Sequence, residues 1–323
     1  MKKTEKGKKQ IKSKLHPRNK HKYGYDFDRL INAYPSLGQY IITNKYQNKS
    51  INFFDSEAIK ALNKALLMRH YAVEFWDIPS DYLCPPIPSR ADYIHYMADL
   101  LGENNAEKIP RGKKIQVLDI GVGANMVYPI IGHQEYGWSF CGTDIDPVAL
   151  QNARQIIAKN LAFTKAIRLK EQTSSTEIFF GIIDKKDHFD LTICNPPFYS
   201  SEAEAKANTL RKLKNLQGQK VSGISKNFGG QASELWCEGG EKKFVRRMIK
   251  ESKKFAANCL WFSTLIAKET HLKPIYQTLK KANATTIKTI EMTQGNKLSR
   301  IVAWTFLGEK RRSQWVEKRW GKW

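Results

Sequence analysis

The sequence predicts an α/β fold: a doubly wound, mostly parallel sheet of seven strands, preceded by a small helical N-terminal region. Between residues 113 and 195, short apolar runs that end in glycine or a polar residue alternate with helical segments. That alternation is the pattern of a parallel sheet with helices on both faces. Two further strand-like runs, residues 285–292 and 300–306, follow each other directly. An antiparallel pair that closes a parallel sheet favours a Rossmann-like topology other than the dehydrogenase form.

The composition favours a polyanionic partner. The chain has 323 residues, a net charge of +23 and 41% hydrophobic residues, so it can bury a sizeable core beneath a basic surface. Nucleic acid is the first candidate, because lysine and arginine displace counterions from phosphates. A membrane is the second, but no apolar run approaches the ~20 residues that span a bilayer. Five scattered cysteines without CxxC spacing fit a reducing cytoplasm better than a zinc site or a disulfide frame.

The N-terminal part of the chain divides in two. Residues 1–22 contain ten lysines and arginines and one glutamate, and such a block is expected to be a disordered basic arm. The arm either contacts RNA phosphates or acts as a solubilising tail. Residues 23–100 are expected to be a helical RNA- or substrate-binding region, with a helix at 56–71 capped by Asp55 or Ser56. A stiff segment with three prolines in four positions precedes a helix at 91–101.

Residues 101–309 are expected to form the Rossmann-like domain. A polar, basic stretch at 200–235 is interpreted as a long mobile loop with a functional role. The tail at 310–323 is basic and holds three tryptophans, so it either packs on the core or binds RNA by stacking. The other predicted elements are strands at 115–120, 138–143, 189–194 and 259–266, helices at 147–159, 240–253 and 271–282, and a turn at 294–296 between the last two strands.

A ligand site is predicted where the first two strands of the domain end. Gly121 and Gly123 directly follow the first strand, and glycines let the backbone turn tightly and approach a ligand. The third glycine of a dinucleotide site is missing, because position 126 is Met, which favours a ligand without phosphates. Asp144 ends the next strand, where an acid accepts hydrogen bonds from both ribose hydroxyls. S-adenosylmethionine satisfies both conditions.

The strongest signal is Asn-Pro-Pro-Phe at residues 195–198, directly after an apolar strand. An exocyclic amine is a poor nucleophile, because its lone pair is delocalised into the ring. The Asn195 side-chain oxygen and the Pro196 carbonyl can both accept N–H bonds from such an amine and hold it in line with a methyl donor. Prolines 196 and 197 fix the backbone, and Phe198 offers a face for a flipped base. These residues predict transfer of a methyl group to a base amine.

Together these motifs resemble one family. The chain is similar to the bacterial large-subunit ribosomal RNA adenine methyltransferases (the 23S rRNA adenine-N6 enzymes) and to their eukaryotic relative that acts on spliceosomal small nuclear RNA. The resemblance covers roughly residues 15–307. It is carried by Leu15-His16-Pro17-Arg18-Asn19, Ile51-Asn52-Phe53, Pro86-Ile87-Pro88-Ser89-Arg90-Ala91-Asp92-Tyr93-Ile94-His95, Asp119-Ile120-Gly121-Val122-Gly123, Asn195-Pro196-Pro197-Phe198 and Glu238-Gly239-Gly240-Glu241.

The resemblance implies roles that the residues alone do not. Arg90 would contact the cofactor's carboxylate, a contact for which a guanidinium is suited because it can form two parallel hydrogen bonds. Thr176 would also contact the cofactor. Asn52 and Phe53 would lie near the substrate adenine, and the 200–235 loop would gate the pocket. The expected cofactor contacts are Arg90, Asp119, Gly121, Gly123, Asp144, Thr176 and Asn195. The expected RNA contacts are Arg18, Lys20, Lys22, Asn52, Phe53, Lys206, Arg211 and Lys212.

The expected function is therefore methylation of the N6 amine of one adenine in 23S ribosomal RNA, by a cytoplasmic monomer that needs no metal and no membrane. Two alternatives stay open. One is methylation of guanine N2 or of a glutamine amide, which use a similar motif with Tyr more often than Phe. The other is a non-catalytic RNA-binding factor of ribosome assembly, against which the intact Gly121, Gly123, Asp144 and Asn195 argue.

Overall fold

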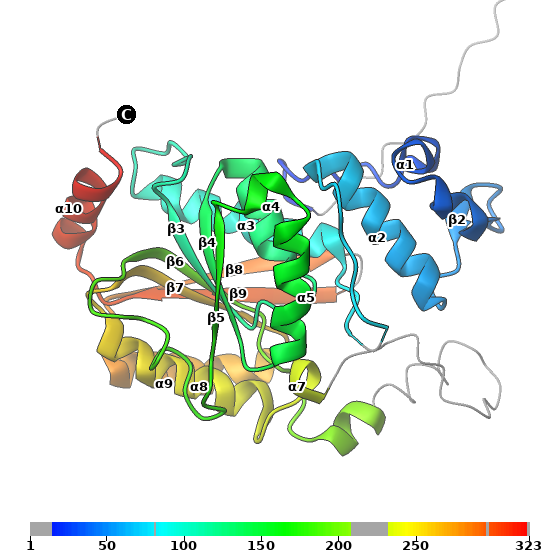
Figure 1. The fold of residues 1–323 in the computed structure, drawn as a ribbon. Helices are drawn as coiled ribbons and strands as arrows, with labels where there is room; N and C mark the ends of the chain where they lie inside the picture. Colours follow the sequence, from blue (N-terminus) through cyan, green and yellow to red (C-terminus); the bar gives the residue numbers. More distant parts are fainter. Residues whose placement is uncertain (1–14, 81, 208–231, 295–296, 322–323) are drawn as a thin grey trace, which may run out of the picture.

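The sheet that the sequence predicts is present. The computed structural model describes residues 15–80, 82–207, 232–294 and 297–321. Its central sheet has seven strands in the order β5-β4-β3-β6-β7-β9-β8 (Figure 1). The first five strands in this order pair in parallel, whereas β9 is antiparallel to both β7 and β8. The strands are β3 (Gln116–Ile120), β4 (Ser139–Asp144), β5 (Ile167–Glu171), β6 (Phe189–Cys194), β7 (Cys259–Ile266), β8 (Thr286–Gln294) and β9 (Lys297–Thr305).

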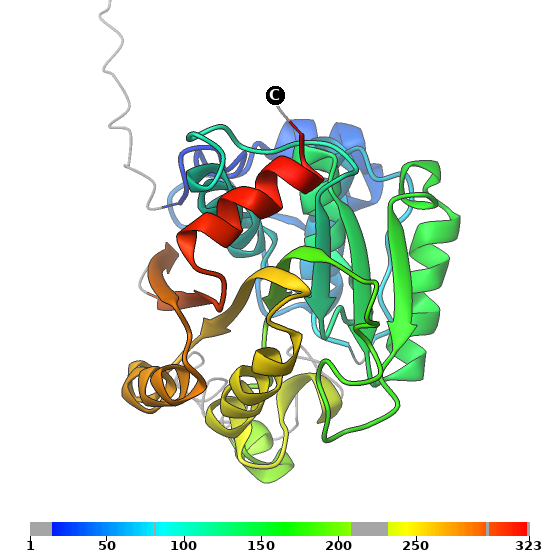
Figure 2. The same cartoon turned by 90° about the vertical axis from the view of Figure 1, so that its left-hand side faces the viewer.

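Helices cover both faces of this sheet (Figures 1 and 2). Side chains of one strand alternate between the two layers: Ile193 of β6 packs in the core beneath α3 to α5, and its neighbour Cys194 in the core beneath α8 and α9. Because both faces are covered, every residue of β6 and β7 is buried. The covering helices are α3 (Ile87–Glu103), α4 (Val127–Tyr136), α5 (Pro147–Ala158), α8 (Gly240–Ser252) and α9 (Leu272–Ala282). α2 (Ser56–Tyr71) lies to the side and packs against α4.

The N-terminal region is less helical than predicted. It contains α1 (Phe27–Ala33), the 3₁₀ helix η1 (Pro35–Tyr40) and an antiparallel hairpin of β1 (Ile41–Thr43) and β2 (Lys49–Ile51). Asn44 makes the turn: its side-chain oxygen accepts from the Tyr46 and Asn48 amides at 2.9 and 3.1 Å. Such local side-chain bonds favour turns over helices. The cap of α2 is confirmed as Asp55, which accepts from the Glu57 and Ala58 amides.

The expectation of a disordered arm is wrong for residues 15–22. His16, Asn19 and His21 are 3%, 0% and 4% exposed. The His16 amide donates to Asp92 at 3.0 Å, and the Asn19 side-chain amide donates to the Pro88 carbonyl at 2.8 Å. These specific contacts with α3 overcome the local charge density. Residues 1–14 lie outside the described part of the chain.

The C-terminal tail packs on the core, which is one of the two outcomes considered for it. Residues Glu309–Arg319 form α10, which lies over one end of the sheet (Figure 1). The indoles of Trp315 and Trp320 both donate to the buried Asp190 carboxylate, at 2.7 and 2.9 Å. Among the described residues, no helix has the length and apolarity needed to cross a membrane.

Candidate active site

A cavity opens at the carboxyl ends of β3, β4 and β6. Six of the residues predicted from the sequence line its wall: Arg90, Gly121, Gly123, Asp144, Asn195 and Pro197. Parallel strands end at a common edge, so residues that follow separate strands meet there. The structure therefore brings together two motifs that lie more than seventy positions apart in the sequence.

The glycine turn after β3 is tied to the acid that ends β4. Gly121 and Gly123 have φ values of +72° and +63°, which favour glycine. A Cβ on Gly123 would also lie 3.3 Å from the Asn125 side chain and 3.5 Å from that of Glu234. The Gly123 amide donates to one Asp144 carboxylate oxygen at 2.9 Å, and the Asp146 amide to the other at 3.0 Å. Asp144 is thereby oriented at the cavity wall.

Asp119 lies behind this turn, at the penultimate position of β3, and does not line the cavity. Its side chain is fully buried, and neither carboxylate oxygen has a hydrogen-bond partner in the described part of the chain. Burial, reinforced by the charge of Asp144, raises the pKa of Asp119 well above its usual range. Burial likewise raises the pKa of Asp144. An unpartnered buried acid is costly unless a donor reaches it.

Arg90 and Asn195 are bonded to each other. One terminal guanidinium nitrogen of Arg90 donates to the Asn195 side-chain oxygen at 3.0 Å and to the Tyr128 hydroxyl at 2.8 Å. Arg90 is only 9% exposed. A guanidinium has hydrogen-bond donors and no acceptor, so it can form a hydrogen bond only with the oxygen of the Asn195 side-chain amide. Arg90 therefore orients the side chain on which the predicted chemistry depends.

The segment after Asn195 is held by a second stretch of chain. The Phe198 and Tyr199 amides both donate to the Leu235 carbonyl at 3.0 Å, and the Cys237 amide donates to the Tyr199 carbonyl at 3.1 Å. Leu235 ends the short helix α7 (Ala232–Leu235). Pro196 is buried and Phe198 is half-buried, and neither lines the cavity.

Sequence reasoning missed several wall residues, among them Tyr128, Glu234, Trp236 and Arg247. Trp236 and Cys237 directly precede the Glu238-Gly239-Gly240-Glu241 motif, and that proximity was the available signal. Thr176 does not line the cavity, although its neighbours Ser175 and Glu177 do. The Thr176 hydroxyl instead lies 3.1 Å from the Ser174 hydroxyl, because this turn is closed by its own side chains.

The predicted RNA contacts are scattered, and several make internal contacts. Arg18 pairs with Asp99 at 2.6 Å and donates to the Tyr136 hydroxyl at 3.0 Å. Lys20 pairs with Glu135 at 2.8 Å, and Lys22 donates to the Pro17 carbonyl. Asn52 and Phe53 are exposed, and neither lines the cavity. Lys206 pairs with Glu202 at 2.7 Å, while Arg211 and Lys212, with most of the predicted loop, lie outside the described residues.

Three features define the chain as an S-adenosylmethionine-dependent methyltransferase. The Rossmann-like sheet is closed by an antiparallel pair, and the glycine turn is bonded to the acid that ends the next strand. Asn-Pro-Pro-Phe follows the adjoining strand, at the same cavity. More particularly, the chain belongs to the RNA methyltransferase family, whose pattern matches residues 9–308. Within the described residues, no three His, Cys, Asp or Glu side chains are grouped to hold a metal ion.

Named relatives match nearly the whole chain. The ribosomal RNA large subunit methyltransferase F of Cytophaga hutchinsonii is 54% identical over 320 residues, covering 98% of this chain and 99% of that protein. The protein of the same name from Marinomonas sp. is 51% identical and covers 98% of each. Among solved structures, the hMettl16 catalytic domain in complex with a MAT2A 3′UTR hairpin has a TM-score of 0.76 at 29% identity, covering 92% of this chain and 96% of that chain. The N-terminal domain of human METTL16 in complex with SAH has a TM-score of 0.72 at 26% identity, covering 91% and 99%.

Proposed function

We propose that this methyltransferase modifies the exocyclic N6 amine of one adenine in large-subunit (23S) ribosomal RNA. The observation that carries the proposal is the position of Asn195, which lines the same cavity as Gly121, Gly123 and Asp144. The names of the bacterial relatives support large-subunit ribosomal RNA as the substrate. The net charge of +23 supports a polyanionic partner.

The residues around the cavity fit S-adenosylmethionine. Asp144 presents its carboxylate at the strand end where ribose hydroxyls bind, and Arg90 offers a guanidinium to a carboxylate. When bound, S-adenosylmethionine supplies an electrophilic methyl group on its sulfonium sulfur.

Asn195 and Pro196 prepare the amine. An amide oxygen has two acceptor positions, so the Asn195 oxygen that Arg90 engages retains one for an N–H of adenine. The Pro196 carbonyl accepts the other N–H, and together these bonds orient the amine lone pair toward the methyl group. The nitrogen would take up the methyl group that the bound cofactor supplies, and the proton lost from nitrogen passes to water. No strong base is needed, because the amine becomes acidic only as the methyl group arrives.

Phe198 and Phe53 are the aromatic candidates for contact with the base. Phe198 is a phenylalanine where guanine-N2 and glutamine methyltransferases more often have tyrosine, which favours adenine. Phe53 is 48% exposed on the turn that leads into α2, where it is free to stack with RNA. Five free cysteines and a ribosomal substrate together favour a cytoplasmic location.

Mass spectrometry of ribosomal RNA tests the proposal. Large-subunit RNA from cells that lack this protein should lose one N6-methyladenosine, and a plasmid copy of the gene should restore it. An unchanged set of methylated adenosines, or loss of a methylated guanosine instead, would contradict the proposal.

A further inference from the structure

The amino edge of the sheet, at the strand ends opposite the active site, concentrates lysines. Strand register places the turns before β3, β5, β6 and β7 along this edge, since Gln116 pairs with Ser139, Phe140 with Ile167 and Phe189 with Cys259. We call the exposed lysines of these turns the amino-edge lysines. They are Lys113, Lys114, Lys165, Lys185, Lys186, Lys253 and Lys254.

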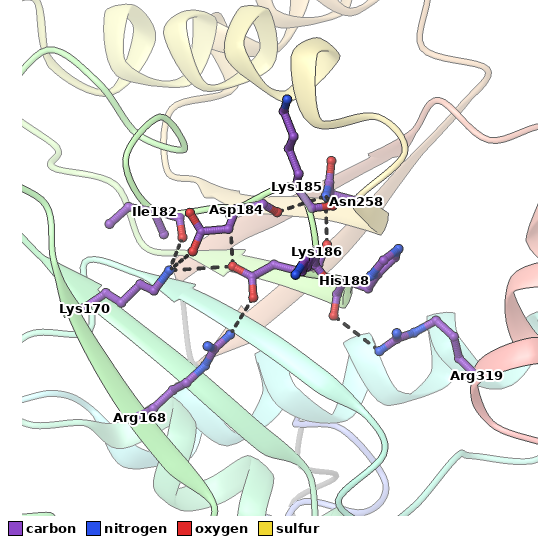
Figure 3. A network of polar contacts seen from close by, with 10 residues as sticks. Arg168, Lys170, Ile182, Asp184, Lys185, Lys186, His188, Asn258 and Arg319 are labelled. Carbon is purple, nitrogen blue, oxygen red and sulfur yellow. Dashed lines mark hydrogen bonds and ion pairs between the residues drawn. The ribbon is translucent and has the colours of Figure 1, made fainter.

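The acidic side chains of these turns are already paired. Asp187 pairs with Arg168 and Lys170, and Asp184 pairs with Lys170 (Figure 3). Over the described ranges, no carboxylate lies within ion-pair distance of any amino-edge lysine, whereas Asp184 and Asp187 each have a cation at 3.3 Å or closer. The charge of the amino-edge lysines is therefore left for an external partner.

Several lysines near the active-site end are paired. Lys206 pairs with Glu202, Lys243 with Glu238 and Lys268 with Glu204. Lys242 and Lys273 near this end are exposed and, in the described residues, have no carboxylate within ion-pair distance. The amino edge differs in degree, because within the described part of the chain all seven of its exposed lysines lack such a partner. This concentration of unpaired charge indicates that the amino edge has a binding role of its own.

The turn that carries Lys185 and Lys186 is preorganised. The Asn258 side-chain amide donates to the Asp187 carbonyl at 2.8 Å and to the Asp184 carbonyl at 3.3 Å. In Figure 3 the Lys185 side chain points away from this network. A turn that is already ordered loses little conformational entropy when it binds, so its two ammonium groups are suited to phosphates.

Helix α10 extends the same surface. It is joined to the turn by Arg319, which donates to the His188 carbonyl at 3.3 Å (Figure 3), and Figure 2 shows it lying across this side of the molecule. α10 exposes three cationic side chains, Lys310, Arg311 and Lys318. It also exposes two acidic side chains, Glu309 and Glu317. The His188 ring lies 5.7 Å from that of Trp315, so an aromatic pair lies among the cations.

We propose that the amino edge is a second RNA-binding surface, which holds phosphates of the substrate RNA at a distance from the methylated base. This inference rests on the proposed function. β6 has six residues, so its two ends are five rises of ~3.3 Å, or about 17 Å, apart. An RNA that reaches both ends must extend at least this far from the target base, so a stem-loop too short to span the sheet would not reach the amino edge.

The test compares two RNAs and two double variants. The RNAs are a short stem-loop with the methylated adenine and a longer large-subunit fragment that keeps its flanking helices. Lys185→Ser with Lys186→Ser removes two charges at the amino edge; Lys242→Ser with Lys273→Ser removes two exposed lysines at the other edge. For the longer RNA, we expect the first pair to raise KM severalfold and to reduce the slope of log KM against log salt by about 2. For the stem-loop, we expect KM and kcat to stay unchanged.

Equal effects of the first double variant on both RNAs, or no effect on either, would overturn the second surface. The control double variant should shift both RNAs alike or neither. Failure of the proposed function is distinguishable, because the unmodified protein would then methylate neither RNA.

Discussion

At the scale of single residues, we propose that the Arg90–Asn195 hydrogen bond prepares the chemistry. Because Arg90 can only donate, the 3.0 Å bond determines which end of the Asn195 amide is the oxygen. If the amide were rotated, its NH₂ group would face the substrate amine and repel it. Arg90 is thus a positioning residue for Asn195, in addition to the cofactor contact that family resemblance implies.

Arg90→Met should lower kcat by about 100-fold at saturating S-adenosylmethionine and RNA, because small errors in the position of a reacting group cost about that much. Arg90→Lys keeps one donor and should recover part of kcat. Steady-state kinetics separate the roles: an arginine that served only the cofactor would change KM for S-adenosylmethionine and leave kcat intact.

Some residues of the site could be predicted from the sequence, and others could not. Asp144 and Asn195 could be predicted because each follows an apolar strand, and strand ends converge. Tyr128 could not, since an aromatic residue in a helix usually packs in a core. Arg18 and Lys20 were predicted to contact RNA, but their partners Asp99 and Glu135 lie far away in the sequence, where charge counting cannot detect them.

At the scale of elements, α10 is attached to the sheet through one buried carboxylate. Asp190 accepts from the indoles of Trp315 and Trp320 and from the Gln116 amide. It lies near the amino end of β6, the strand that Asn195 directly follows. The carboxyl-terminal half of α10 is therefore coupled to the amino end of this strand.

Asp190→Ala should lower the free energy of unfolding by about 3 kcal/mol or more, since several buried donors lose their acceptor together. Urea denaturation followed by circular dichroism measures it. Trp315→Phe removes one donor only and should cost about 1–2 kcal/mol. An unchanged urea midpoint in Asp190→Ala would refute the role given to this carboxylate.

Element predictions succeeded where burial is continuous. Strands β6 and β7 are covered on both faces and were recognisable as apolar runs. β5, at the sheet edge, reads Ile-Arg-Leu-Lys-Glu with only one buried residue, and its sequence showed no clear strand signal. The β1–β2 hairpin escaped prediction because its strands have only three residues each.

At the scale of the whole molecule, buried histidines make stability depend on pH. His21 and His95 are 4% and 0% exposed. Burial, with the neighbouring charges of His70 and Lys20 for His21, and of His16 and Arg18 for His95, lowers the pKa of each to about 3. Below pH 6.5 the unfolded chain therefore binds protons that the folded protein does not.

The stability contributed by these rings is complete above pH 6.5 and is lost as the pH falls toward 3. At pH 5 the loss is about 2 kcal/mol per ring, from 1.5 pH units at ~1.4 kcal/mol each. Urea denaturation at pH 7 and pH 5 should show it, and His95→Phe should reduce the difference. A free energy of unfolding that is the same at both pH values would contradict this account.

The overall architecture could be predicted from alternating strands, glycine turns and helices, because those patterns are local. The approach of residues 235–237 to residues 198–199 could not, since a long intervening stretch separates them and the backbone hydrogen bonds that join them do not depend on residue type. That approach completes the cavity wall, so the full site required the fold.

The most direct test of the account is methyl transfer in vitro. Purified protein, S-adenosylmethionine with a labelled methyl group, and large-subunit ribosomal RNA from cells lacking the protein are combined, and the labelled nucleoside is identified by mass spectrometry. The account predicts label on N6 of a single adenosine with the unmodified protein, and at least a 100-fold lower rate with Asn195→Ala, which removes the oriented acceptor. Label on guanosine, or a near-normal rate with Asn195→Ala, would contradict it.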